Sequence, residues 1–122
     1  MADSDAQDKL GVRYLLGQGV QQDYAQARYW FEKSAAQGNP YAENELGFMY
    51  AAGKGVPQDY AASLQWYQRA SDHGLASAQY NLGLMYLNGI GTQVDKEKAK
   101  QLFKMAADNG FAPARQSLQS MS

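Results

Sequence analysis

Few residues of this chain have the chemistry needed for catalysis, and they do not form a catalytic set. His73 is the only histidine, and the 122-residue chain has no cysteine. An aspartate recurs every 36 residues, as Asp23, Asp59 and Asp95, whereas carboxylates that act in acid–base catalysis would not recur in every repeated unit. We interpret these aspartates as helix N-caps and His73 as a capping or surface residue near a helix C-terminus. The sequence predicts no enzyme, no metal site and no cofactor.

Two other patterns resemble sites for charged ligands. Gly17-Gln18-Gly19 recurs as Gly53-Lys54-Gly55, but no Lys-Ser or Lys-Thr follows, as a phosphate-binding loop requires. Eleven basic and twelve acidic residues give a net charge of -1, so the chain lacks the basic surface of a nucleic-acid-binding protein. A run of basic residues comprises Lys96, Lys98, Lys100 and Lys104. We interpret it as a solvated helix face or, alternatively, as a patch for an acidic partner.

A unit that repeats every 36 residues must position these side chains. It is marked by recurring Leu-Gly pairs and tyrosines: Leu10-Gly11, Leu46-Gly47 and Leu82-Gly83, with Tyr14, Tyr50 and Tyr86. Such a period indicates stacked units that bury their apolar faces only against their neighbours. The length suits about one domain. We predict a single solenoid domain over residues 1–122, with repeats at 6–41, 42–77 and 78–113.

Each unit contains two segments with helical periodicity and shows no strand pattern. In the middle unit, the first segment has apolar residues at helical spacing: Ala42, Leu46, Met49 and Tyr50. Asn39 and Pro40 are suited to its N-cap and first position, and Gly53 to its C-terminus. Asp59 precedes the second segment, which ends at Gly74. The unit is therefore predicted to be a helix-turn-helix.

The first helix of each unit has a glycine in its interior. Gly11 and Gly47 occupy positions where glycine costs about 1 kcal/mol relative to alanine. We expect that the missing side chain lets a neighbouring helix approach closely. The large aromatic residues of the second helices are expected to fill the space between units: Trp30, Phe31, Trp66, Tyr67 and Phe103.

The pattern A-x-x-x-L-G-x-x-Y-x-x-G-x-G-V-x-x-D, followed by W-[FY]-x-x-A-[AS]-x-x-G, resembles the Sel1-like repeat, a relative of the tetratricopeptide repeat. Three ungapped copies cover residues 6–113. The resemblance implies an all-α fold, an α/α solenoid with a right-handed superhelix of three repeats and a C-terminal capping helix over 114–122. It also implies a non-catalytic scaffold or adaptor, often in bacterial signalling, secretion or host contact. Cysteine-rich members are linked to penicillin binding, but this chain has no cysteine, so that enzymatic alternative does not carry over.

Both ends of the repeat array depart from the pattern as caps would. At the C-terminal end, Gln119 and Ser122 replace the Gly and Tyr expected in the first helix of a fourth repeat. At the N-terminal end, Arg13 occupies the position of Met49 and Met85 in the later repeats. Terminal repeats with a polar outer face keep such arrays soluble. We therefore expect a complete short array.

The face of each first helix opposite the core is the candidate partner surface. In tetratricopeptide-like solenoids the equivalent positions line a concave groove, and the resemblance implies the same here. The predicted surface comprises Asp8, Val12, Leu15, Leu16, Asn44, Phe48, Ala51, Tyr80, Asn81, Leu84, Leu87 and Asn88. We hypothesise a short peptide anchored by Phe48 and Tyr80 and held by asparagines. Alternatively, Val12 and Leu84 contact the adjacent helix and are only partly exposed.

These patterns favour a monomeric adaptor that binds a protein or peptide partner. The alternative is a structural or assembly component of a bacterial envelope or secretion-related complex, which would self-associate. No apolar run approaches the roughly 20 residues of a transmembrane helix, so no membrane insertion is expected. The first residues, Met1 to Asp5, are polar and acidic rather than typical of a signal peptide. This predicts a cytoplasmic protein, or a periplasmic or secreted one if a signal was removed.

Overall fold

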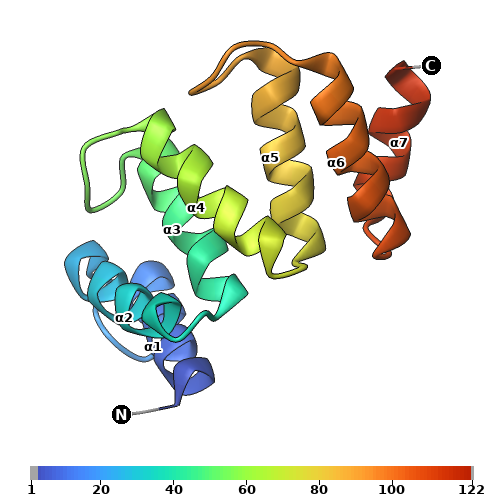
Figure 1. The fold of residues 1–122 in the computed structure, drawn as a ribbon. Helices are drawn as coiled ribbons and strands as arrows, with labels where there is room; N and C mark the ends of the chain where they lie inside the picture. The colour runs from blue at the N-terminus through green and yellow to red at the C-terminus, as the bar shows by residue number, and fades with distance from the viewer. Residues whose placement is uncertain (1–2, 122) are drawn as a thin grey trace.

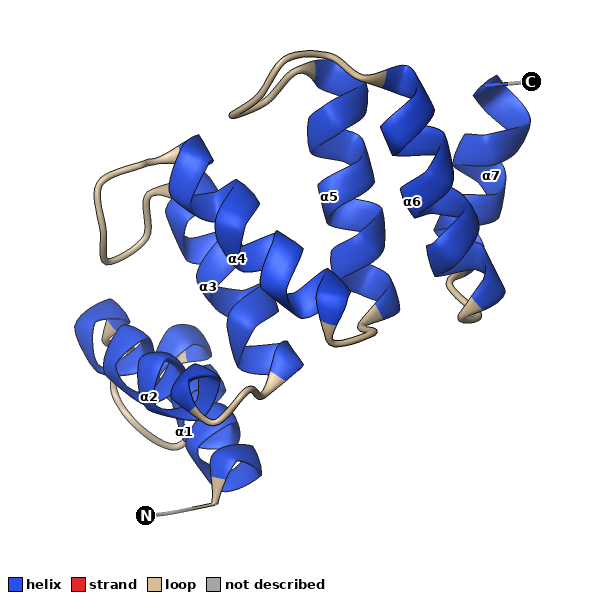
Figure 2. Ribbon diagram, viewed as in Figure 1, coloured by secondary structure: helices blue, strands red, loops and turns tan. Residues whose placement is uncertain are grey.

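The computed structural model describes residues 3–121, and this part of the chain forms seven α-helices and no strand (Figure 2). The helices are α1 Ser4–Leu16, α2 Tyr24–Ala36, α3 Pro40–Ala52, α4 Tyr60–Asp72, α5 Ala76–Asn88, α6 Lys96–Asp108 and α7 Ala112–Met121. The odd-numbered helices begin 36 residues apart, as the sequence period predicts. Ser122, where the sequence lacks a repeat tyrosine, lies outside the described residues.

The predicted start and stop signals of the helices are confirmed. A side-chain oxygen of the recurring aspartate accepts a hydrogen bond from a backbone N–H in the first turn of each even-numbered helix up to α6. These bonds join Asp23 to Gln26, Asp59 to Ala62 and Asp95 to Lys98. Asn39 caps α3 in the same way, with Pro40 in the first turn. Gly53 ends α3 with a left-handed φ of 69°, a conformation that favours glycine.

The glycine inside each first helix makes room for an aromatic ring of the second helix. A Cβ atom added at Gly47 would lie 2.7 Å from the ring of Tyr67, far inside van der Waals contact. The other repeats have the same arrangement, with Phe31 against Gly11 and Phe103 against Gly83. The predicted close approach is therefore confirmed. These rings also belong to core clusters that reach the next repeat, as predicted, with Phe31 beside Leu46 and Tyr67 beside Leu82.

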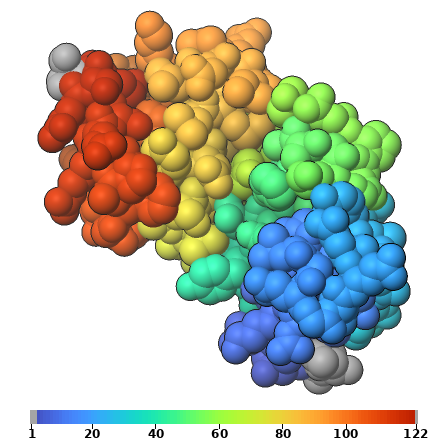
Figure 3. Space-filling view, turned by 180° about the vertical axis from the view of Figure 1, so that it is seen from behind, coloured from blue at the N-terminus to red at the C-terminus, as the bar shows by residue number. Residues whose placement is uncertain are grey.

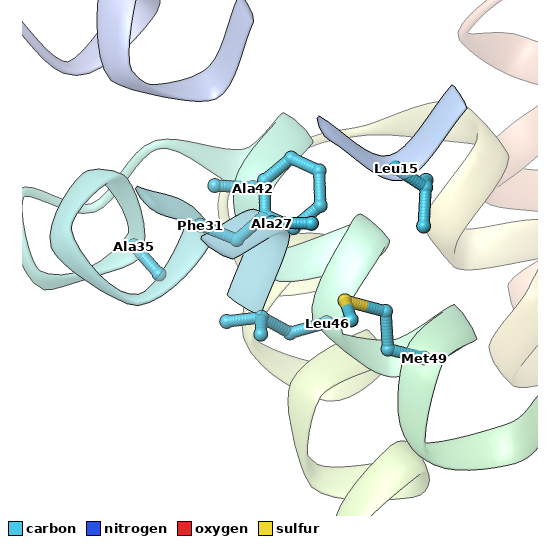
Figure 4. Packing of buried hydrophobic residues seen from close by; sticks show 7 residues of the cluster. All are labelled: Leu15, Ala27, Phe31, Ala35, Ala42, Leu46 and Met49. Carbon is cyan, nitrogen blue, oxygen red and sulfur yellow. The ribbon is translucent and has the colours of Figure 1, made fainter. Parts of the chain in front are cut away.

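Buried apolar side chains continue the core from one repeat to the next. One cluster joins α1, α2 and α3 through Leu15, Ala27, Phe31, Ala35, Ala42, Leu46 and Met49 (Figure 4). Trp66 is only half-buried at the edge of this cluster, with the Arg69 guanidinium 4.5 Å from its ring. The two tryptophans are therefore not central core residues, since Trp30 is also half-buried.

The helix pairs follow one another along the molecule, with α1 and α7 at opposite ends (Figure 1). The same succession is visible from behind, as colour bands that run from blue to red (Figure 3). The last helix, α7, packs on α6 and begins at Ala112, two residues before the predicted start of the capping helix. The molecule is an α/α solenoid of helix-turn-helix units, as predicted.

Candidate partner-binding surface

The candidate surface is the face of α1, α3 and α5 that points away from the second helices. Its exposed apolar residues are Phe48 on α3, with 41% of its surface accessible, and Leu16 at the end of α1, with 58%. Both line a shallow pocket of about 170 Å³, together with Leu15, Gln22, Tyr24 and Lys54. The structure thus places an accessible aromatic side chain beside a hollow at the α1–α3 junction.

Several predicted surface residues contribute to the core as well. Leu15 is buried and belongs to the core cluster of the first repeat. Tyr80 is half-buried, with its ring centroid 5.6 Å from that of Phe103 and 5.1 Å from that of Phe111. Four more residues of the surface are half-buried: Val12, Ala51, Leu84 and Leu87. All of them except Ala51 pack against a core cluster. Phe48 and Leu16 are therefore the large apolar members of the set with the least evident packing role, and Phe48 is the aromatic one.

Polar members of the predicted surface meet across neighbouring helices. Asn81 of α5 donates a hydrogen bond from Nδ2 to Oδ1 of Asn44 on α3, at 3.3 Å. Asn88 is exposed and donates to the backbone oxygen of Leu84 on its own helix. Of the predicted asparagines, Asn88 is thus the one most open to solvent.

Asp8 lies at the other end of the surface and has an unusual environment. Its Oδ1 atom is buried and has no hydrogen-bond partner. Burial and, to a lesser extent, the nearby Asp5 carboxylate raise the pKa of Asp8 to about 6. Burial and the Asp8 carboxylate also raise the pKa of Glu45 on α3. Burial and Glu45 raise the pKa of the Tyr67 hydroxyl to about 12.

Tyr41 is a surface residue that the sequence reasoning missed. It is 59% exposed and lies on α3 seven residues before Phe48, which places the two rings on the same helix face with Asn44 between them. The seven-residue spacing in the sequence would have revealed it. The equivalent residues in the other repeats, Asp5 and Ser77, are polar, so this position is not apolar in every repeat.

A second missed feature is a polar bridge inside each repeat. The fourth residue of the first helix pairs with the C-cap of the second helix, 30 residues later. The three bridges are Gln7–Gln37 at 2.9 Å, Glu43–His73 at 2.6 Å and Gln79–Asn109 at 3.0 Å. His73 is indeed a capping residue, but it also faces a buried carboxylate. Aligning Glu43 with the two glutamines would have suggested this role.

A cleft between α5, α6 and α7 lies outside the predicted surface, apart from Leu87. Its volume is about 590 Å³, and both polar and apolar side chains line it. The lining residues are Leu87, Lys96, Glu97, Lys100, Ser117, Ser120 and Met121. Within residues 3–121 no three His, Cys, Asp or Glu side chains gather as metal ligands would. None of the helices described is long and apolar enough to cross a membrane.

The helix pairs, the glycine–aromatic packing and the uninterrupted first-helix face define a helical repeat protein of the solenoid class. The family model of the Sel1 repeat matches three times, at residues 4–39, 40–75 and 76–111. The chain therefore belongs to the Sel1 repeat family. Proteins with such repeats are typically non-catalytic, and the repeats mediate protein interactions.

Solved structures support this assignment. A Sel1 repeat protein from Oxalobacter formigenes is 42% identical, with a TM-score of 0.89 over 98% of this chain and 90% of that one. A protective antigen of uropathogenic Escherichia coli, c5321, is 38% identical, with a TM-score of 0.90 over 96% of this chain and 25% of that one. Cysteine rich protein B of Helicobacter pylori shares the fold, with a TM-score of 0.81 at 20% identity over 94% of this chain and 88% of that one. No relative was found among curated proteins.

Proposed function

We propose that this protein is a non-catalytic adaptor that binds a peptide segment of a partner protein along the concave face lined by α1, α3 and α5. Phe48 is the apolar anchor of this interaction. The observation that carries the proposal is its exposure: the ring is 41% accessible beside a pocket, whereas Val12 and Leu84, its equivalents in the other repeats, pack against the core.

Tyr41 extends the anchor along α3. Its ring is 59% exposed and lies on the same helix face as Phe48, about two turns away. Aromatic side chains are enriched among the residues that contribute most to protein interfaces, because they bury a large area with few rotatable bonds. Asn44, between the two rings, offers a polar group to the backbone of a bound peptide.

A selection from a random peptide library tests the proposal. Peptides selected on the wild-type protein are measured against Phe48→Ala and against Met105→Ala, in which an equally exposed apolar residue on α6 is removed. We expect Phe48→Ala to weaken binding about 30-fold, the effect of losing a contact worth about 2 kcal/mol. Met105→Ala should leave the affinity unchanged. Equal affinities of the three proteins for the selected peptides would overturn the proposed anchor.

The truncation of Tyr80 is a poor test of the same surface, because its ring contacts Phe103 and Phe111. Loss of binding in Tyr80→Ala could therefore follow from loss of packing. Sedimentation velocity at micromolar concentration separates the adaptor from the assembly component. We expect a monomer, and self-association that survives Phe48→Ala would favour an assembly role.

A further inference from the structure

The first helices of neighbouring repeats meet in one register, in which residues 37 positions apart face each other. At the α3–α5 junction these residues are Asn44 and Asn81, which share a hydrogen bond of 3.3 Å. At the α1–α3 junction the same two positions hold Asp8 and Glu45. The charge of the Asp8 carboxylate contributes to the raised pKa of Glu45, which agrees with this register. The second junction therefore pairs two amides where the first pairs two acids.

The two pairs differ in how they can be satisfied. An amide has both a donor and an acceptor, so Asn44 and Asn81 need no proton from solution. An ionised carboxylate only accepts, so two of them cannot form a hydrogen bond unless one carries a proton. Oδ1 of Asp8 is buried without a partner, which is the situation expected of an acceptor whose opposite group is also an acceptor.

Charged groups around the pair do not neutralise it. Asp5 on α1 is a third acid, and its charge raises the pKa of Asp8. Glu45 on α3 in turn raises the pKa of the Tyr67 hydroxyl on α4. The ion pairs within the described residues, Arg28–Glu32 and His73–Glu43, involve other side chains. Burial and like charges thus act in the same direction on Asp8 and Glu45.

We propose that Asp8 and Glu45 form a proton-dependent latch between the first and second repeats. A proton shared by the two carboxyl groups closes the latch, and ionisation of both opens it by placing two negative charges against each other. The latch depends on this junction alone and does not rest on the proposed peptide-binding function. It lies on the same face, however, so it adjusts the junction next to Phe48.

The sign of the pH effect follows from the direction of the pKa shifts. The pKa of Asp8 in the folded chain is raised to about 6 from an ordinary value of 3.8. A carboxyl whose pKa is raised by folding stabilises the fold at low pH, and the contribution is lost as the pH rises through the folded value. The latch is therefore closed at pH 5 and open at pH 7.5.

Thermal unfolding of three proteins tests the latch. Asp8→Asn replaces the half-buried acid by an amide, and the control, Asp108→Asn, removes an exposed acid of α6. We expect Asp8→Asn to melt close to the wild type at pH 5.0 and about 3–6 °C higher at pH 7.5. The difference between Asp108→Asn and wild type should be the same at both pH values.

The titration of Asp8 in the folded wild-type protein, followed by the chemical shift of its carboxyl carbon, gives an independent readout. We expect a midpoint above pH 5.5 that moves down in Glu45→Gln, since the opposing charge is then absent. Hydrogen exchange should also show protection of α1 falling relative to α5 between pH 5.0 and 7.5. A midpoint below pH 4.5, or a melting difference for Asp8→Asn that does not change with pH, would overturn the latch.

Discussion

The junction between the first two repeats and the junction between the second and third repeats have one backbone register and different surface chemistry. Asp8 and Glu45 occupy the equivalent positions at the first, and Asn44 hydrogen bonds to Asn81 at the second. The apolar residues beneath are nearly the same at both: Leu46 and Leu82 are fully buried. Stacking thus depends on the buried apolar residues of each first helix, which form its inner stripe.

The comparison shows why the outer face can specialise. Positions on that face can change from amide to acid without changing the packing that defines the solenoid, so their identity is free to follow a partner or a condition such as pH. Positions on the inner stripe have no such freedom, because a ring or a methyl group of the next helix fills the adjacent space. Four sets of variants test this division, from the largest expected effect to the smallest.

Leu46→Ala should have the largest effect, because it removes a fully buried side chain at the first junction. We expect the free energy of unfolding to fall by about 3 kcal/mol. Leu10→Ala is the matched control, since Leu10 occupies the same repeat position but is half-buried on the first helix. Its cost should be about 1 kcal/mol. Equal costs in urea denaturation would show that burial at the junction does not determine stability.

Gly47→Ala should cost about 2 kcal/mol in spite of the better helix propensity of alanine, because the new Cβ lies 2.7 Å from the ring of Tyr67. In a Tyr67→Ala background the clash is absent, and the same substitution should stabilise the protein. A double-mutant cycle by chemical denaturation measures this reversal of sign. A stabilising effect of Gly47→Ala in the wild-type background would contradict the packing argument.

His73→Ala should cost about 1–2 kcal/mol, because the Glu43 carboxylate, 3% exposed, loses its partner at 2.6 Å. The double variant Glu43→Gln/His73→Asn copies the neutral bridge of the third repeat and should return close to wild-type stability. Thermal unfolding of the single and double variants provides the comparison. A double variant less stable than His73→Ala would show that the bridges are not interchangeable.

Asn44→Asp/Asn81→Glu moves the acid pair to the second junction and should have the smallest effect. The variant should lose about 1 kcal/mol of stability between pH 5.0 and 7.5 relative to wild type, a change equivalent to less than one pKa unit at a partly exposed site. The reciprocal variant Asp8→Asn/Glu45→Asn should lose the pH dependence of the first junction. Unchanged pH profiles in both variants would show that the shared register does not transmit the chemistry of the pair.

Much of the fold was predictable from the sequence because its signals are local and recur three times. Asp59 before a helical stripe, Pro40 after Asn39, and Gly53 at a helix end each act within one turn, and the structure confirms each of them. The role of the aromatic rings was predicted in part. Helical periodicity shows which face a ring occupies but not every helix that it meets, so the cluster of Tyr67 with Leu82 in the next repeat was predicted but its contact with Gly47 was not.

The candidate surface was harder to predict than the fold. The angle of a residue around a single helix does not show how far the next helix covers its side chain. Leu15 and Phe48 were both placed on the surface, yet Leu15 is 8% exposed and Phe48 is 41% exposed. Tyr41 was missed because the equivalent residues, Asp5 and Ser77, are polar, and the Glu43–His73 bridge was missed because the residue types at its two positions change between repeats.

By itself, the sequence determined the repeat, the helices, their caps and the stacked architecture, because hydrogen bonds within a turn and apolar periodicity along a helix are local properties. Only the tertiary structure decided which outer-face residues stay exposed and which face each other across a junction. The pairing of Asp8 with Glu45 depends on the offset between two helices that are 36 residues apart in the chain. That offset is set by the sum of the core contacts beneath.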